Sequence, residues 1–233
     1  MTLLGARDPA QPLLTLYAGP GRVELSGATT ANWVAKSANL LVDGLGSPDR
    51  VGLLLPLHWQ GVALLLAGAA TGATVVLASE PADLAGCPVA FVLAEYAEAA
   101  LDAGVEDVLA LSGHPLGAAL PVVPAMVLDY AREVPSYGDH WNGPGGPAPR
   151  FEVEGRVAGP PPELGLSDAD RVLTALDPAI SAGLLLGLLG PLAAGASLVL
   201  VPEPSSADLL AITTAEQVTA TVGADVPGLR ALS

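Results

Sequence analysis

An internal repeat of about thirty residues constrains the fold of this chain more than any other feature. Residues 49–79 read DRVGLLLPLHWQGVALLLAGAATGATVVLAS, and residues 170–202 read DRVLTALDPAISAGLLLGLLGPLAAGASLVLVP. Both copies open on Asp-Arg-Val, place a proline after the first apolar run, at Pro56 and at Pro178, and carry a later Gly-Ala pair. Two copies of one pattern predict two units with the same supersecondary structure.

Each copy has the pattern of a strand, a helix and a second strand. The first apolar runs are continuous, which is typical of strands buried on both faces of a parallel sheet. Gly72 and Gly195 follow the apolar helical stretches, at positions that favour a left-handed backbone at a helix end. Such a unit predicts parallel strands joined by a right-handed crossover. The expected strands are 51–55, 74–77, 172–176 and 197–201, and the expected helices are 59–70 and 181–194.

The flanking segments continue the alternation of helices and strands. Between the copies, residues 134–163 are rich in proline and glycine and predict an extended connector, with a short hairpin at 151–157. The predicted fold class is therefore α/β, with mainly parallel sheets flanked by helices. The predicted domains are a first lobe at 1–133, the connector, and a second lobe at 164–233. The further expected elements are helices at 29–43, 95–103 and 207–215 and strands at 89–93, 105–111 and 218–222.

The composition requires a hydrophobic core and argues against several partners. Of the 233 residues, 51% are hydrophobic and 14% are charged, which excludes disorder for most of the chain. Acidic residues outnumber basic ones by 24 to 9, a net charge of −15, which argues against nucleic acids and anionic membrane surfaces as partners. The single Cys87 cannot form an internal disulfide, and it offers no metal-ligand spacing with the three scattered histidines. We therefore expect no metal and no bound cofactor.

One stretch leaves a membrane alternative open. Residues 179–201 are uncharged and long enough to span a bilayer. Pro191 and Gly195 interrupt them, however, and no aromatic residue anchors either end. A buried helix, a glycine turn and a buried strand explain the same residues, and the N-terminus lacks the basic region of a secretory signal. We expect a cytoplasmic protein without membrane association.

The first copy and the residues before it resemble a known enzyme family. Residues 25–78, LSGATTANWVAKSANLLVDGLGSPDRVGLLLPLHWQGVALLLAGAATGATVVLA, resemble the opening of the adenylate-forming superfamily, which includes acyl-CoA synthetases, nonribosomal adenylation domains and luciferases. Residues 170–204 and 218–232 resemble a later stretch of the same large domain. The resemblance implies the N-terminal domain of that fold, built from two βαβ-based sheets.

The motifs that carry the family's chemistry differ in this chain. The family's phosphate-binding loop, rich in Ser, Thr and Gly and ending in Pro-Lys-Gly, is expected between the repeats, where residues 142–147 read NGPGGP. Prolines lack the backbone donors of a phosphate cradle, and the single lysine, Lys36, lies far upstream. The family's P-L-x-H motif falls on residues 177–180, so that Ile180 replaces its histidine. The family's L-T-Y tyrosine is also missing at residues 25–27.

The chain also ends before the family's ribose-binding aspartate and its C-terminal domain, which carries a catalytic lysine. Carried over residue by residue, the resemblance therefore implies no catalytic residue. We expect a pseudoenzyme rather than an active ligase.

Three residues remain as candidates for a ligand crevice at the carboxyl ends of the strands. His58 follows the first strand of one repeat, and Asp177 and Ser181 follow the first strand of the other. For each, a structural role is the simpler interpretation: His58 can bond to backbone at a helix start, and Asp177 can cap the helix that follows it. Asp139, His140 and Trp141 could contact a partner, although a solvated loop is the more common role of such a cluster.

Three functional hypotheses follow. The first is a noncatalytic relative of adenylate-forming enzymes that binds a small molecule, either an acyl, a CoA-like or a nucleotide ligand, between its lobes. The second is an interaction or scaffold protein that acts as a homo-oligomer or through a protein partner. The third is a ligase whose missing groups a partner supplies.

Overall fold

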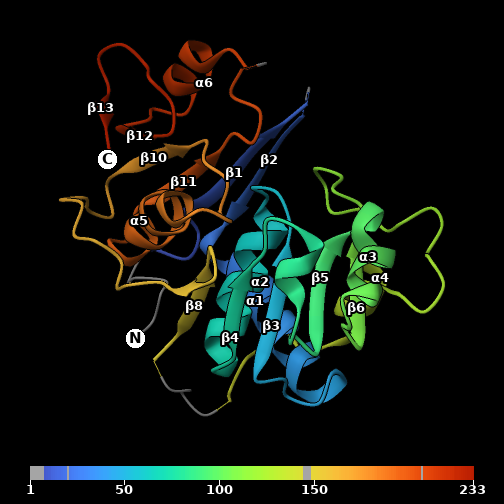
Figure 1. The fold of residues 1–233 in the computed structure, drawn as a ribbon. Coiled ribbons are helices and arrows are strands. Elements are labelled where there is room, and N and C mark those ends of the chain that lie inside the picture. Colours follow the sequence, from blue (N-terminus) through green and yellow to red (C-terminus); the bar gives the residue numbers. More distant parts are fainter. Residues whose placement is uncertain (1–7, 20, 144–147, 206) are drawn as a thin grey trace. The chain divides into compact units, whose positions relative to one another are not determined.

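The computed structural model describes residues 8–19, 21–143, 148–205 and 207–233 and divides into two compact units (Figure 1). The first unit comprises Met1–Thr30, Pro56–Trp59 and Gly159–Ser233, and the second comprises Ala31–Leu55 and Gln60–Ala158. Each contains a mainly parallel sheet with helices, so the predicted α/β class is confirmed.

The second unit is built on a seven-stranded sheet in the order β7-β6-β5-β3-β4-β8-β9. All neighbouring pairs are parallel except β8 and β9, which form the expected short antiparallel hairpin. The strands are β3 (Arg50–Leu54), β4 (Thr74–Leu77), β5 (Val89–Leu93), β6 (Asp107–Leu111), β7 (Leu128–Asp129), β8 (Arg150–Val153) and β9 (Arg156–Val157).

Apolar side chains cover both faces of this sheet, as the continuous apolar strands predict. On one face, the ring of Phe91 in β5 meets that of Tyr130 edge-on at 5.6 Å, and the Tyr130 hydroxyl bonds to Ser37 Oγ at 2.8 Å. On the other face, Ala90 and Val92 of β5 pack in one core cluster with residues of α3. The helices of this part are α1 (Gly27–Asn39), which continues as a π-helix (Leu40–Gly44), α2 (Trp59–Thr71), α3 (Ala97–Asp102) and α4 (Tyr130–Glu133), with short 3-10 helices at Pro81–Leu84, Ala94–Tyr96 and Val134–Ser136.

The first unit is built on a six-stranded sheet in the order β13-β12-β10-β11-β1-β2, in which only the β1–β2 pair is antiparallel. One face carries Leu173 and Val199, which pack with Ile212 of α6. The other face packs against the helix that follows β10. The elements are β1 (Pro12–Ala18), β2 (Gly21–Ser26), β10 (Arg171–Thr174), β11 (Ser197–Leu200), β12 (Ala220–Val222), β13 (Arg230–Ala231), the π-helix η5 (Gly183–Leu189), α5 (Gly190–Ala193) and α6 (Leu209–Ala215).

The two repeats form the predicted strand–helix–strand units. In the first copy β3 pairs in parallel with β4, and in the second β10 pairs in parallel with β11. Gly72 and Gly195, which end the two helices, have φ angles of +83° and +82°. Both therefore have the left-handed backbone that their position after a helix predicts.

The division of the chain differs from the predicted lobes at its beginning. The sequence predicts residues 12–26 in the first lobe, 1–133, but β1 pairs with β11, so that these residues belong to the sheet formed by the C-terminal part. The predicted connector also contains β8, which extends the other sheet by pairing with β4. The physical reason is that each belongs to a hairpin, β1–β2 or β8–β9, that pairs with a strand far away in sequence, and a local apolar pattern does not specify a distant partner.

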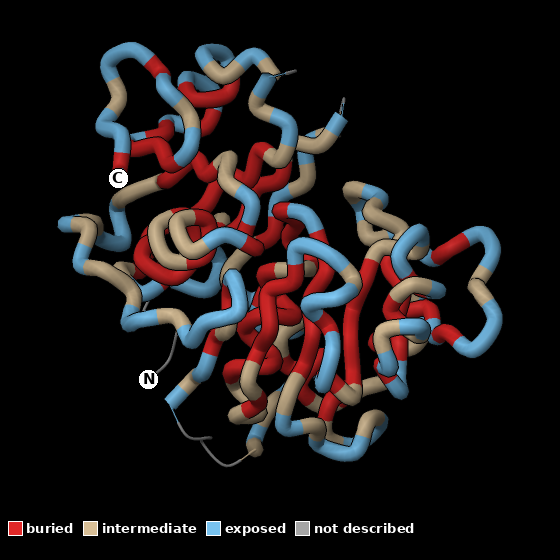
Figure 2. Tube along the Cα trace, viewed as in Figure 1, coloured by how far each residue is buried: buried red, intermediate tan, exposed pale blue. Residues whose placement is uncertain are grey.

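The apolar stretch at 179–201 is divided between a helix and a strand. It contains η5, α5 and the whole of β11, and Figure 2 shows these elements as largely buried. Within the part of the chain that the structure describes, no helix is long and apolar enough to cross a membrane.

Candidate functional site

The arginines of the repeated Asp-Arg-Val motif are held in ion pairs. Arg50 on β3 donates to both carboxylate oxygens of Glu152 on β8, each at 2.8 Å, and this lowers the pKa of Glu152. Arg171 on β10 donates to the carboxylate of Glu216 and, at 2.7 Å, to Thr15 Oγ1. The motif therefore stabilises the sheet in each repeat, and its arginines are engaged by protein groups rather than directed at a ligand.

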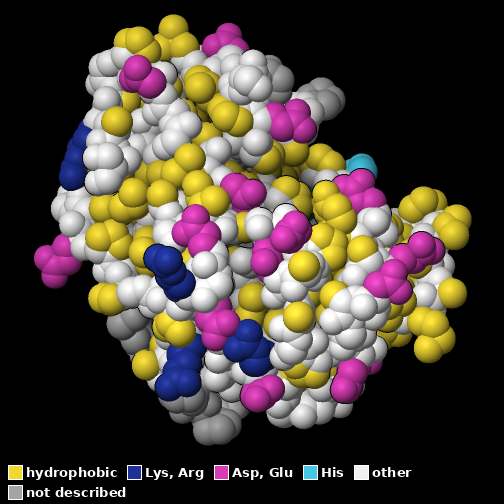
Figure 3. Space-filling model, viewed as in Figure 1, with side chains coloured by type: hydrophobic (Ala, Val, Ile, Leu, Met, Phe, Trp, Pro, Cys, Tyr) yellow, Lys and Arg dark blue, Asp and Glu magenta, His cyan; other side chains and the backbone are white. Residues whose placement is uncertain are grey.

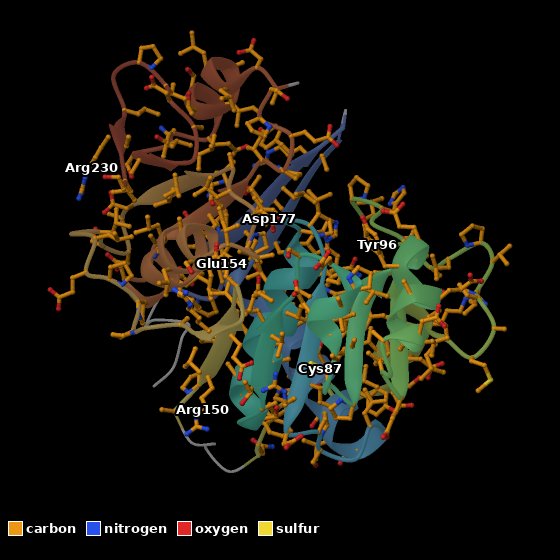
Figure 4. All side chains as sticks on the ribbon, in the orientation of Figure 1. Cys87, Tyr96, Arg150, Glu154, Asp177 and Arg230 are labelled. Atoms are coloured by element: carbon orange, nitrogen blue, oxygen red, sulfur yellow. The ribbon has the colours of Figure 1, made fainter. Side chains whose placement is uncertain are left out.

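Asp177 lies in the turn between β10 and the helix that follows it (Figure 4). Its Oδ1 accepts a hydrogen bond from the Ala179 N–H at 2.8 Å, and its carbonyl accepts one from the Ile180 N–H at 3.3 Å. These bonds stabilise the turn, as expected for an aspartate just before a helix. Asp177 and Ile180 are both exposed, so the turn is accessible to a ligand.

Two glycines allow close backbone approaches around this turn. A Cβ on Gly183 would lie 1.8 Å from the Asp177 carbonyl oxygen, and one on Gly223, whose φ is +72°, would lie 2.4 Å from Leu176 Cγ. The Ala175 N–H also donates to the Val222 carbonyl at 2.9 Å. The loops that follow β10 and β12 therefore lie against each other at the carboxyl ends of their strands.

β10 and β12 are also the strands at which the direction of the connections reverses. The chain leaves β10 for β11 on one side and leaves β12 for β13 on the other. In open parallel sheets, ligands bind outside the carboxyl ends of the two strands at such a switch point. Ser181 begins the helix after the Asp177 turn, so these two candidates lie together at this end of the sheet.

His58 has a more enclosed position than the other two candidates. It belongs with Pro56–Trp59 to the first unit, is only 7% exposed, and has its ring centroid 5.5 Å from that of Trp59. This is the packing of a histidine at a helix start, because α2 begins at Trp59. The structure thus gives His58 a packing role and gives Asp177 the accessible position.

The single lysine is committed to backbone carbonyl groups. Lys36 on α1 donates from Nζ to the Tyr137 carbonyl at 2.6 Å and to the Pro135 carbonyl at 3.3 Å. One turn further along the chain, Asn39 Nδ2 donates to the Gly138 carbonyl at 2.8 Å. These hydrogen bonds attach the start of the predicted connector to α1. Those of Lys36 also engage the ammonium group that a phosphate-binding loop would need.

The residues expected at the phosphate loop are described only in part. Asn142 and Gly143 of the NGPGGP segment are described, whereas residues 144–147 lie outside the described residues. Just before them, His140 Nδ1 lies 2.8 Å from Asp139 Oδ1, and this hydrogen bond lowers the pKa of Asp139. Asp139 and His140 are both exposed, which fits the solvated loop that the sequence favours.

A cavity of about 330 Å³ lies at the opposite end of the second repeat's helix from Asp177. Its wall includes Gly190 of α5 and the carboxylate of Glu163. The described residues that line it include none of the three sequence candidates and no lysine or arginine that could bind a phosphate or carboxylate ligand. We therefore locate the candidate site at the β10–β12 switch point and not here. The lining residues are Pro161, Pro162, Glu163, Leu164, Gly165, Leu166, Gly190, Ala193 and Ala194.

One buried polar cluster was not found from the sequence. Glu216, 7% exposed, accepts hydrogen bonds from the Tyr17 hydroxyl at 2.7 Å and from Arg22 Nε at 2.6 Å, besides the bond from Arg171. Tyr17 and Arg22 lie nearly two hundred residues from Glu216 in the chain, so no spacing indicates the cluster. Both carboxylate oxygens of Glu216 accept hydrogen bonds from these groups, which is the arrangement of a structural network rather than of a catalytic site.

Cys87 and the other metal-binding residue types form no site. Burial raises the pKa of the Cys87 thiol, which disfavours a reactive thiolate. Among the described residues, no three side chains of His, Cys, Asp and Glu lie close enough together to hold a metal ion.

Comparison with known proteins assigns this chain to a family. No family model matches the sequence. A protein of Mycobacterium tuberculosis (strain ATCC 25618 / H37Rv), described as a TIGR03089 family protein, is 40% identical over 223 residues, which is 91% of each of the two chains. The chain belongs to the TIGR03089 family. This membership itself specifies no ligand and no reaction.

Comparison with solved structures shows that this chain has the fold of the N-terminal part of adenylate-forming enzymes. The chain is similar to an acyl-CoA synthetase of Brucella canis, with a TM-score of 0.75 and 18% identity over 94% of this chain. It is also similar to the anthranilate CoA ligase AuaEII, with a TM-score of 0.72 and 17% identity over 94% of this chain. It spans 46% and 48% of those two chains, so it covers about half the length of the solved structures that it matches. The predicted resemblance is therefore confirmed for the fold.

Proposed function

We propose that this chain is a noncatalytic member of the adenylate-forming fold that binds a small molecule at the carboxyl ends of β10 and β12. The observation that carries the proposal is the accessible Asp177–Ile180 turn at the switch point of the sheet. In an open parallel sheet this is where a ligand contacts loops from two strands at once.

The side chains at this turn favour the acyl group of a ligand over the phosphate groups of a nucleotide or of CoA. Ile180, 38% exposed, presents an apolar group where the related family has a histidine. Asp177 and Asp225 are exposed carboxylates on the loops that follow β10 and β12. They would repel the phosphate groups of ATP and of CoA alike, and Lys36 is bonded to backbone carbonyl groups elsewhere.

Thermal unfolding with four ligands separately, ATP, AMP, CoA and a fatty acyl-CoA, tests the proposal. A ligand that binds only the folded state at a hundred times its Kd stabilises it by about 2.7 kcal/mol, which raises the Tm of a chain of this size by roughly 5–10 °C. We expect such a rise with the fatty acyl-CoA, because its acyl chain supplies the apolar contact, and none with CoA, AMP or ATP.

A matched pair of variants locates the binding. Ile180→Glu places a carboxylate in the Asp177–Ile180 turn of the proposed site. Leu210→Glu places one at an exposed apolar position of α6 in the same unit. The rise in Tm should disappear in Ile180→Glu and persist in Leu210→Glu. Equal rises in both variants, or no rise with any of the four ligands, would contradict the proposal.

A further inference from the structure

The loop between β6 and β7 exposes an unusual number of large apolar side chains. Leu116, Val122 and Met126 are 70%, 78% and 87% exposed, and Leu128 follows at 39%. These four residues, here called the apolar loop surface, are half of the eight exposed large hydrophobic residues in the described chain. Figure 3 shows hydrophobic side chains gathered beside Asp and Glu on the right of the view, where this loop projects.

Buried side chains and hydrogen bonds hold the loop in this conformation. Leu120 and Val127 are buried in the core cluster of α3. The Leu120 N–H donates to Asp129 Oδ2 at 2.9 Å, and Arg132 Nη2 donates to the Leu120 carbonyl at 2.9 Å. At the start of the loop, Ser112 Oγ donates to the Ala118 carbonyl at 2.6 Å. Anchored residues thus alternate with exposed ones, and a fixed apolar surface on a folded protein is typical of an interaction site.

Acidic side chains are exposed on the helix that packs with this loop. Between Arg50 and Arg132 the sequence has eight acidic residues and no lysine or arginine. Glu95, Glu98 and Asp102, on α3 and the turn before it, are exposed, and α3 packs on the same core cluster as the loop. Tyr96, 37% exposed and labelled in Figure 4, lies between Glu95 and Glu98 in the chain. Arg132 does not offset this charge, because its Nε lies 3.1 Å from Asp129 Oδ2 in an ion pair.

We infer that the apolar loop surface binds a cationic amphipathic helix of a partner protein, with apolar side chains on the loop and Lys or Arg against the carboxylates of α3. The charge argues against two other occupants: a second copy would bring the same carboxylates, and an anionic membrane would be repelled. The neighbouring edge strand β7 has only two residues, so it offers little backbone for a partner strand. This inference does not depend on the proposed ligand site, which lies in the other unit.

A synthetic Leu/Lys peptide of about 18 residues, long enough to form an amphipathic helix, is the probe. Its fluorescence anisotropy is measured with the full chain. A peptide of the same composition, with its leucines spread around the helix, controls for charge alone. We expect saturable binding of the amphipathic peptide that weakens as salt is added, and much weaker binding of the control peptide.

Two matched double variants test the location. Val122→Ser with Met126→Ser removes the most exposed apolar groups of the surface, and Val157→Ser with Leu210→Ser removes comparable groups elsewhere. The first pair should weaken binding about tenfold or more, and the second less than twofold. All four positions are exposed, and thermal unfolding of each variant confirms that it folds.

Three results would overturn the inference. The first is equal weakening by both double variants, and the second is equal binding of the two peptides. The third is another occupant of the surface: self-association in sedimentation, or binding to anionic vesicles, that the first double variant abolishes while the peptide does not bind.

Discussion

Glu216 is a buried carboxylate whose charge is balanced by neighbours from three strands. Burial by itself raises the pKa of this group, but hydrogen bonds from Arg22, Tyr17 and Arg171 outweigh burial and lower the pKa from 4.5 to about 2. Burial of its phenol raises the pKa of Tyr17, and the hydrogen bond to Glu216 raises it further. A carboxylate that is held ionised in this way links β1, β2 and β10 only while it is charged.

Glu216→Gln should therefore destabilise the fold in a pH-dependent way. Because the folded pKa lies below the unfolded one, the stabilisation is fully present above about pH 4.5 and is lost as the pH falls towards about 2. We expect a loss on the order of 3 kcal/mol at pH 7, since removal of the buried carboxylate takes from the partly buried Arg171 the partner with which it forms its shortest ion pair. Urea unfolding of the wild type and of Glu216→Gln measures the difference in their free energy of unfolding, once at pH 7 and once at pH 3.

The difference between wild type and variant should be clearly smaller at pH 3. Asp139→Asn is the control, because Asp139 forms an exposed pair with His140 and its removal should change the urea midpoint little at either pH. An equal loss at both pH values would show that Glu216 does not titrate as described.

At the scale of elements, a glycine sets how closely the second repeat's helix approaches its sheet. A Cβ on Gly187 of η5 would lie 2.5 Å from Thr174 Oγ1 of β10, and Thr174 is fully buried. Glycine at this position therefore permits a contact that any larger residue would prevent. The corresponding helix of the first repeat has a similar site, where a Cβ on Gly68 of α2 would lie 2.5 Å from Val75 Cγ2 of β4.

Gly187→Ala should destabilise the first unit although alanine is the better helix former. The propensity gain is at most about 1 kcal/mol, whereas overpacking against a buried strand costs about 1–3 kcal/mol. Chemical unfolding is measured for Gly187→Ala, for Thr174→Ala and for the double variant. The three losses in free energy of unfolding give the coupling between the two positions. The double variant should lose less stability than the sum of the single losses, because Thr174→Ala removes the clashing hydroxyl.

Gly159→Ala controls for the loss of glycine itself, because a Cβ there meets no atom within 4 Å. It should leave the midpoint nearly unchanged. If the losses in free energy of unfolding for Gly187→Ala and Thr174→Ala are additive, the helix does not pack against β10 through this contact.

At the scale of the whole molecule, the 233-residue chain should not catalyse adenylation. The reaction requires a held triphosphate, an aligned carboxylate and a cation at the developing charge. Ile180 replaces the related family's histidine, and Lys36 is bonded to the Tyr137 carbonyl. Without positioned groups the reaction forfeits a proximity contribution of up to roughly 7–11 kcal/mol.

Adenylation activity is measured as isotope exchange between pyrophosphate and ATP, with fatty, aryl and amino acids as substrates. We expect exchange at background with every acid, alongside strong exchange by an acyl-CoA synthetase that has an intact phosphate loop. Substrate-dependent exchange above background would restore the interpretation of the chain as a ligase.

The sequence alone determined the repeated units. Continuous apolar runs, prolines after the first strands, and Gly72 and Gly195 after the helices predict both parallel strand pairs and both left-handed caps, and all of these are observed. These features are local, since a glycine cap or a buried strand leaves its pattern in the residues that form it. The resemblance to adenylate-forming enzymes rests on the same local motifs, and it is confirmed for the fold.

Only the tertiary structure decided which distant segments meet. It placed β1 beside β11, joined Glu216 to Tyr17 and Arg22, and used Lys36 to hold the Tyr137 carbonyl. The candidate site divides in the same way: the sequence indicated Asp177, whereas the structure showed that its turn is exposed at a switch point and that His58 is packed. Pairings of this kind depend on which surfaces the whole fold brings together, and a partner nearly two hundred residues away leaves no spacing to read.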